Sequence, residues 1–130
     1  MGARLIVRGL AGHCDTFGLP AGTVTAANAS NISDGAAAVL MMRQSKADAL
    51  QLPRLATICG MTSHAQAPEW FTTAPIKAMS SLMQQLAWTK ESIDCFEINE
   101  AFAVVPLVAM QTLQLPHDKV NVHGGAFVLG

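Results

Sequence analysis

The side chains best suited to covalent chemistry are those of three cysteines, Cys14, Cys59 and Cys95. They are widely spaced and odd in number, which differs from the paired spacing of a zinc site or a secreted disulfide framework. A cysteine near neutral pH is mostly thiol, and it becomes a nucleophile only where a base or a helix terminus stabilises the thiolate. We therefore interpret each cysteine as a small buried hydrophobe. From their spacing we predict no metal site and expect a reducing, cytoplasmic compartment.

Polar side chains beside apolar runs are the remaining candidates. Asn99 follows the apolar run 93–98, and an asparagine in that place is most simply a helix cap. Ser30 lies among small polar residues and is most simply part of a turn. His64 is kept as a possible substrate contact, although a histidine without a located partner is more often structural. The glycine-rich run 124–130 lacks the lysine and Ser/Thr of a P-loop, which makes phosphate binding a weak alternative.

Glycine, proline and the spacing of apolar residues predict the elements that position these side chains. Residues 36–42 suit a buried strand, and residues 75–86 show helical spacing, with Thr73 as the cap. The same signals predict a surface helix over 45–52, begun by Ser45 and Asp48. They predict a buried helix over 100–114, capped by Asn99 and kinked at Pro106. Strands are predicted over 54–60, 93–98 and 120–123. Because strand and helix signals alternate, the sequence favours an α/β layered fold.

Charge and hydrophobicity narrow the classes of function. Hydrophobic residues make up 51% of the 130 residues and charged residues 13%, against about 25% charged in an ordinary soluble domain. Much of the surface should therefore meet other protein, and we expect a poorly soluble or oligomeric chain. The net charge of -1 argues against nucleic-acid binding. Arg4 and Arg8 interrupt the apolar run near the N-terminus, and no apolar stretch approaches about twenty residues, which argues against a signal peptide and a membrane span.

Three stretches resemble the thiolase family. Residues 23–42 (TVTAANASNISDGAAAVLMM) resemble the thiolase segment that lines the coenzyme A site, and residues 96–105 (FEINEAFAVV) resemble its Asn-Glu-Ala-Phe motif. Residues 121–130 (NVHGGAFVLG) are similar to the glycine-rich segment that runs directly into Gly-His-Pro in thiolases. The stretch 63–78 is similar too, so the resemblance extends from about Gly18 onward.

The resemblance implies a partial thiolase fold. Intact members have two similar α/β halves in five layers, αβαβα. Residues 18–53 would be the end of the N-terminal half with the coenzyme A segment, and residues 54–130 a truncated C-terminal half, with the division near Pro53. Residues 1–17 match nothing that we can place and are left unassigned.

The resemblance also implies an activity that this fragment lacks by itself. Thiolases use one cysteine as acyl acceptor, a second as acid/base and a histidine as base. None of the three cysteines stands in the matching motifs, and the histidine would follow Gly130. The intact enzyme is expected to be an acetyl-CoA C-acetyltransferase of fatty acid metabolism, which performs the Claisen condensation of acetyl-CoA or the thiolysis of 3-ketoacyl-CoA. Coenzyme A is then a substrate rather than a cofactor, and family members are homo-oligomers, dimers or tetramers. The alternative is a non-catalytic truncated protein that at most binds coenzyme A or associates with related subunits.

The resemblance assigns roles to individual residues. Asn99 matches an asparagine that holds a water, which with the histidine donates hydrogen bonds to the thioester oxygen, and we favour this role over the cap. Ser30 matches a serine that hydrogen-bonds the pantetheine arm, and Ala26 matches a small residue of the same tunnel. Phe71 and Phe102 fall where the family places apolar residues around the acyl end. Asn31, Phe127 and Val128 depart from the residues usual in the family.

Overall fold

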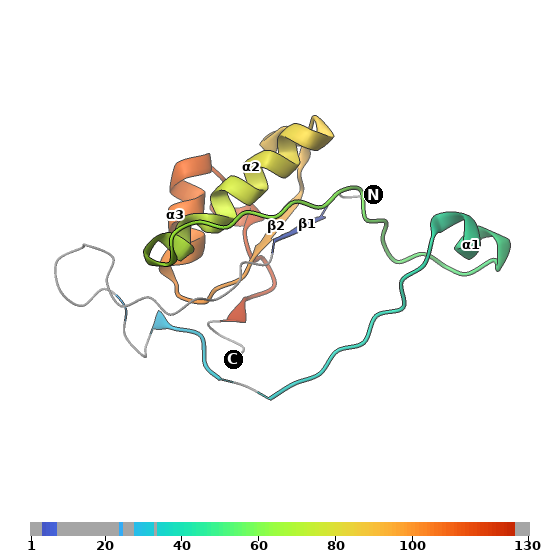
Figure 1. Ribbon diagram of the computed structural model, residues 1–130, viewed down its shortest axis with the longest axis horizontal. Helices are drawn as coiled ribbons and strands as arrows, with labels where there is room; N and C mark the ends of the chain where they lie inside the picture. The colour runs from blue at the N-terminus through green and yellow to red at the C-terminus, as the bar shows by residue number, and fades with distance from the viewer. Residues whose placement is uncertain (1–3, 8–23, 25–27, 33, 127–130) are drawn as a thin grey trace.

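Two parallel strands lie at the centre of the structure, a computed structural model that describes residues 4–7, 24, 28–32 and 34–126. β1 (Arg4–Val7) pairs with β2 (Cys95–Ile98), so that Arg4 lies opposite Cys95 and Val7 lies opposite Ile98. The predicted strand over 93–98 is confirmed for its last four residues. Its partner comes from the start of the chain, where no strand was predicted. Figure 1 shows the two strands side by side.

The helix α2 (Ala74–Leu86) confirms the clearest of the sequence predictions. It follows directly on a 3-10 helix, η2 (Pro68–Thr73), and buries Met79 and Leu82. The prediction that Thr73 caps α2 is wrong, because Thr73 already has helical backbone angles and its side chain makes no cap hydrogen bond. The Thr73 hydroxyl instead donates to the carbonyl of Trp70 over 2.8 Å, within the turn that precedes α2.

The helix α3 (Val104–Leu113) begins later than the sequence predicts. Its N-cap residue is Ala103, not Asn99, and no side chain caps it. The Ala103 N–H donates instead to the carbonyl of Asn28 over 2.9 Å, so the first turn of α3 is joined to a distant part of the chain. Pro106 lies in this first turn, where backbone N–H groups have no partner within the helix. The missing N–H of proline therefore costs no helical hydrogen bond, and the reason for predicting a kink is removed.

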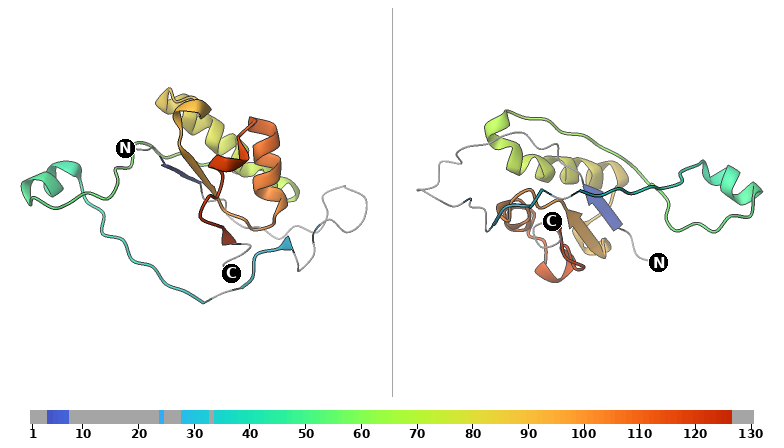
Figure 2. Two further views of the ribbon diagram at one scale, coloured as in Figure 1. Left: turned by 180° about the vertical axis from the view of Figure 1, so that it is seen from behind. Right: turned by 90° about the horizontal axis from the view of Figure 1, so that it is seen from below.

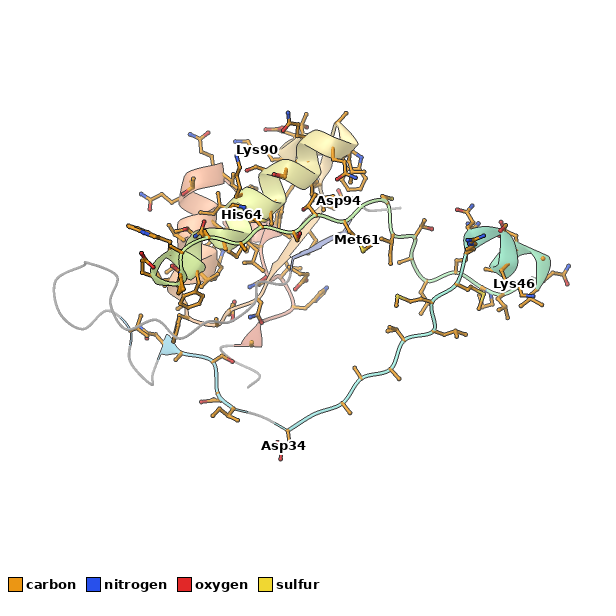
Figure 3. All side chains as sticks on the ribbon, in the orientation of Figure 1. Asp34, Lys46, Met61, His64, Lys90 and Asp94 are labelled. Carbon is orange, nitrogen blue, oxygen red and sulfur yellow. The ribbon has the colours of Figure 1, made fainter. Side chains whose placement is uncertain are left out.

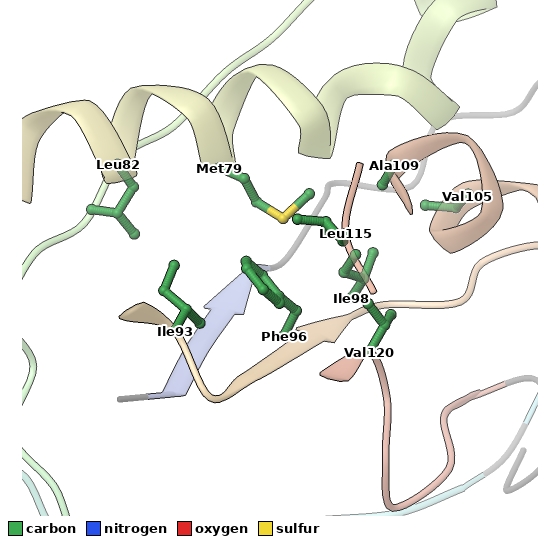
Figure 4. Close-up of a cluster of buried hydrophobic side chains, with 9 residues drawn as sticks. All are labelled: Met79, Leu82, Ile93, Phe96, Ile98, Val105, Ala109, Leu115 and Val120. Carbon is green, nitrogen blue, oxygen red and sulfur yellow. The ribbon is translucent and has the colours of Figure 1, made fainter. Parts of the chain in front are cut away.

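The hydrophobic core lies between the strands and the two longer helices. In Figure 4 α2 passes over β2, and its Met79 side chain points toward Phe96. Met79, Ile93 and Phe96 are fully buried. The cluster is completed by side chains from α2, β2, α3 and the loops, namely Leu82, Ile98, Val105, Ala109, Leu115 and Val120. This packing fixes β2 in space, and the chain leaves β2 at Asn99.

Residues 34–61 form a long arm that leaves the core, carries α1 (Gln44–Ala49) and returns (Figures 1 and 2). The predicted helix over 45–52 is confirmed in part, since α1 ends earlier and neither Ser45 nor Asp48 caps it. The strands predicted over 36–42 and 54–60 are wrong, because neither run has a strand partner among the described residues. Their apolar side chains lie in solvent; Leu40 is 85% exposed and Leu55 is 100% exposed. None of the helices in the described part of the chain has the length and hydrophobicity needed to cross a membrane.

The exposed arm should drive self-association. Leu40→Glu places a charge among the apolar side chains of the arm and is expected to shift the chain toward the monomer, because large exposed apolar surface favours association. Sedimentation velocity over a range of protein concentrations measures this shift. Gln111→Glu, at an exposed position of α3, is the matched control and should leave the association unchanged. Equal association of both variants and the starting protein would contradict this role of the arm.

Candidate functional site

The first two of the three stretches singled out in the sequence are joined by backbone hydrogen bonds. The Ser30 N–H donates to the carbonyl of Ala101 over 3.1 Å, and the Ala103 N–H donates to the carbonyl of Asn28 over 2.9 Å. Between these bonds Ala29 lies opposite Phe102 in an antiparallel bridge. The run of small polar residues therefore lies against the Asn-Glu-Ala-Phe motif, immediately beyond the end of β2.

The third stretch reaches the same place through Ser30 and Asn121. The Ser30 hydroxyl lies 3.4 Å from the carbonyl oxygen of Ala126 and 3.3 Å from that of Asn31. Both contacts are long for a hydroxyl donor, which leaves Ser30 able to turn toward another acceptor. Its side chain thus lies between the small polar run and the glycine-rich turn.

Asn121 binds the end of β2 with its backbone and its side chain. Its N–H donates to the Phe96 carbonyl over 2.8 Å, and its Oδ1 accepts from the Ile98 N–H over 2.7 Å. Its Nδ2 donates to the Ile98 carbonyl over 2.9 Å and to Glu100 Oε1 over 2.7 Å. The predicted strand over 120–123 is wrong, because Asn121 has a left-handed φ of 49° and only Val120 bridges to Phe96.

Glu100 lies directly against the glycine-rich turn. The Gly124 N–H donates to the Asn121 carbonyl over 2.9 Å, and Gly124 has a φ of 86°, which suits glycine. A Cβ atom on Gly125 would lie 2.3 Å from Glu100 Cδ and 2.4 Å from its Oε2, closer than any real contact. The glycine therefore allows the turn to approach the carboxylate.

The two predicted acyl-pocket rings meet. Phe71, in η2, and Phe102 have ring centroids 5.9 Å apart at an interplanar angle of 66°, an edge-to-face contact. Both are half-buried. Asn99, at the end of β2, is exposed, and no hydrogen bond to its side chain comes from the residues that the structure describes. Its role as the holder of a water stays a prediction.

The other predicted residues stand apart from this group or outside the described part. Ala26 lies outside the described residues. His64 is exposed, with Nε2 3.2 Å from Gln66 Oε1, and Figure 3 shows it on the segment that passes over α2. Cys95 is buried as predicted, whereas Cys59 lies exposed on the arm, and Cys14 is outside the described residues. Within the described ranges no three His, Cys, Asp or Glu side chains gather closely enough to hold a metal ion.

The hollows of the described surface include one at α1 and one beside the glycine-rich turn. The larger, of about 610 Å³, lies at α1 and is lined by Asp48, Leu52 and Arg54, none of which belongs to the three joined stretches. The smaller, of about 320 Å³, adjoins the site and is walled by Glu100, Asn121 and Gly125 with residues of α3. Neither hollow is lined by Asn99, Ser30, Phe71 or Phe102, so neither is assigned to the predicted contacts of these side chains.

Comparison with known sequences decides the family. The profile described as "Thiolase, C-terminal domain" matches residues 52–130, and "Thiolase, N-terminal domain" matches residues 4–45. The chain belongs to the thiolase family. The N-terminal match begins at residue 4, within the segment that the sequence analysis left unassigned, and the division near Pro53 stays a prediction.

Relatives of this thiolase chain are much longer than it is. It is 47% identical over 111 residues to a probable acetyl-CoA acetyltransferase of Dictyostelium discoideum, covering 85% of this chain and 27% of that protein. It is 50% identical over 109 residues to acetyl-CoA acetyltransferase 2 of Arabidopsis thaliana, covering 84% and 27%. The chain thus spans about a quarter of the length of these relatives.

Solved thiolase structures confirm the partial thiolase fold. The dimeric peroxisomal thiolase of Saccharomyces cerevisiae superposes with a TM-score of 0.81 at 38% identity, covering 90% of this chain and 30% of that one. A thiolase from Ascaris suum in complex with coenzyme A gives a TM-score of 0.77 at 35% identity, covering 91% and 31%.

Sequence reasoning missed the two residues that bind this thiolase site together, Asn121 and Glu100. The motif containing Glu100 was recognised, but its contact with Gly125 depends on a turn that no local pattern describes. For Asn121 a signal existed, because asparagine is depleted in strands and enriched in left-handed turns, and a glycine pair begins three residues later at Gly124.

Gly125→Ala tests the close approach of the turn to Glu100. The added Cβ would displace the end of the Glu100 side chain, so the expected cost is that of its hydrogen bond from Asn121, about 0.5–1.5 kcal/mol of the free energy of unfolding. Urea denaturation followed by circular dichroism measures this change. Gly35→Ala is the matched control, since nothing lies within 4 Å of its added methyl group. If the two variants lost the same amount, the contact with Glu100 would have no special cost.

Proposed function

We propose that this chain carries the coenzyme A contact and the oxyanion-stabilising asparagine of an acetyl-CoA acetyltransferase. The observation that carries the proposal is the backbone pairing of residues 28–30 with residues 101–103. It places Ser30 beside Phe102 while Asn99 stays exposed at the end of β2. The names of the relatives in Dictyostelium and Arabidopsis, and the coenzyme A in the Ascaris structure, support this choice of substrate.

Each side chain has a defined part in the proposed reaction. The Ser30 hydroxyl hydrogen-bonds the pantetheine arm, and the small Ala26, which lies outside the described residues, is proposed to line the same tunnel. Phe71 and Phe102 narrow the space for the acyl group, which suits a short acetyl unit. Asn99 holds a water that donates to the thioester oxygen as that oxygen gains negative charge. One such donor lowers a barrier by about 3 kcal/mol.

The covalent steps need groups other than those described here. Cys95 is buried with its sulfur 3.4 Å from Glu97 Oε1, and Cys59 lies on the arm. Neither sulfur is hydrogen-bonded to Asn99 or Ser30. In the proposed reaction the nucleophile, the basic histidine and the acid/base cysteine come from thiolase polypeptide other than the described residues. This chain by itself binds the thioester without turning it over.

A second candidate function is a non-catalytic thiolase-like protein that associates with related subunits. The exposed apolar arm favours it, since such a surface needs a protein partner. In either case the intact assembly is a cytoplasmic dimer or tetramer that serves fatty acid metabolism.

Binding of acetoacetyl-CoA to the purified chain tests the proposed function. Titration followed by NMR should show saturable shifts at Ser30 and Phe102. Ser30→Ala is expected to raise the dissociation constant about two- to tenfold, the usual cost of one lost hydrogen bond. Gln111→Ala, on the exposed face of α3, is the control and should bind like the starting chain.

Two outcomes of this experiment would count against the proposal. An absence of saturable binding would overturn the assignment of the coenzyme A contact. Loss of thioester absorbance when free coenzyme A is added to the chain alone would show that a nucleophile is present among its residues. Replacement of the cysteines one at a time would then identify it.

A further inference from the structure

The side chain of Asn121 takes the place of a strand at the carboxyl end of β2. Val120 pairs with Phe96 in a parallel bridge, and the Asn121 N–H continues this pairing with the Phe96 carbonyl. The backbone then turns away, because Asn121 is left-handed. Its side-chain amide, with one acceptor and one donor, binds the N–H and the carbonyl of Ile98, as the next residue of a strand would do.

The residues held by this amide lie on both sides of Asn99. Asn121 Nδ2 is shared between the Ile98 carbonyl and the Glu100 carboxylate. The peptide group that joins Ile98 to Asn99 is therefore fixed through its oxygen, and Glu100 is fixed through its side chain. Asn99 itself is exposed, and no described residue hydrogen-bonds its side chain. The backbone held by Asn121 therefore fixes the point from which the Asn99 side chain extends.

The left-handed turn alone does not explain an asparagine at this position. Gln51, Ala87 and Gln114 also have left-handed backbones, each with a φ of 52°. The side-chain oxygen of Gln114 accepts a hydrogen bond from Lys90, and alanine has no polar side chain to offer. Residues of several kinds therefore occupy such turns in this chain, whereas only an amide of this length makes the bonds to Ile98 and Glu100.

We propose that Asn121 is a positioning residue for Asn99. It fixes the backbone on both sides of Asn99, so that the Asn99 amide holds the water that donates to the thioester oxygen. This inference rests on the proposed function, because Asn99 has a role to be positioned for only if a thioester binds there. Asn121 does not touch the substrate; it acts through Ile98 and Glu100.

The test compares four variants of the full chain: Asn121→Gly, Asn99→Ala, the double variant, and Gln114→Gly as the control. Glycine accepts the left-handed backbone without strain, so Asn121→Gly removes the side-chain bonds and keeps the turn. Gln114→Gly makes the same change at another left-handed residue, away from β2. Affinity for acetoacetyl-CoA is measured by NMR titration, and ¹⁵N relaxation measures the backbone order parameters of Asn99 and Glu100.

Both single variants at the site should weaken binding by about three- to tenfold, and the double variant should weaken it no further than the larger single effect, because the two residues act through one interaction. Gln114→Gly should bind like the starting chain. A merely structural role predicts instead that the two losses multiply. Multiplied losses, or unchanged affinity in a folded Asn121→Gly protein, would overturn the proposal.

The order parameters separate this proposal from the proposed function. If the starting chain binds no acetoacetyl-CoA, the proposed function fails, and the backbone measurement still decides whether Asn121 fixes Asn99. The order parameters of Asn99 and Glu100 should fall from about 0.85 to below about 0.6 in Asn121→Gly, and unchanged values would overturn the positioning role.

Asn121→Asp serves if the glycine variant does not fold. Aspartate keeps the shape and the acceptor for the Ile98 N–H but loses both Nδ2 donors. The Ile98 amide should stay protected from exchange while Glu100 and Asn99 lose order. An aspartate variant as ordered at these two residues as the starting chain would also overturn the proposal.

Discussion

The hydrogen bonds at the carboxyl end of β2 are the constraint on which the rest of the site depends. Packing against α2 and α3 in the core fixes the position of β2, and the residues that follow Ile98 start from this fixed position. Residues 28–30 are bound there by two backbone hydrogen bonds, and the glycine-rich turn is bound by Asn121. None of these pieces is long enough to hold a conformation by itself, so each is ordered by what it meets at the end of the strand.

In the arm the situation is the opposite, because its apolar side chains are exposed and pack against little of the described chain. Fully exposing a leucine that could be buried forgoes about 1.5–3 kcal/mol, and Leu40, Leu55 and Ile58 all lie mostly in solvent. The chain is 51% hydrophobic and 13% charged, and its hydrophobic residues are mostly buried in the body but mostly exposed in the arm. The body buries its share around Phe96, and the arm leaves its share exposed to solvent.

Apolar spacing predicted the helix α2 and the strand β2, whereas the caps that local residue types predicted at Thr73 and Ser45 were wrong. Helix α2 follows from the recurrence of Met79, Leu82 and Leu86, and β2 follows from a short apolar run. The strands over 36–42 and 54–60 had the right composition, but a strand exists only beside a neighbour, which sequence spacing does not supply.

The candidate site could be predicted in its parts but not in its assembly. The motif match identified Asn99, Ser30 and Phe102 as a group before any contact between them was known. Whether Asn99 caps a helix was decided by where α3 begins, and that start depends on a hydrogen bond from Ala103 to Asn28. Asn121 was expected in a strand, but its left-handed backbone turns the chain away from β2. Its side chain then binds the backbone of Ile98 in place of a further strand residue.

The most direct test of the account is the cross-strand contact between Ala29 and Phe102. In an antiparallel pair without mutual hydrogen bonds the two Cα atoms lie about 4.5 Å apart, which brings their Hα protons close together. Nuclear Overhauser spectroscopy of the folded chain should show a strong Hα–Hα peak between these residues, with slowed exchange of the Ser30 and Ala103 amides. Absence of the peak, with both amides exchanging as in an unfolded peptide, would contradict the joining of the two motifs and with it the candidate site.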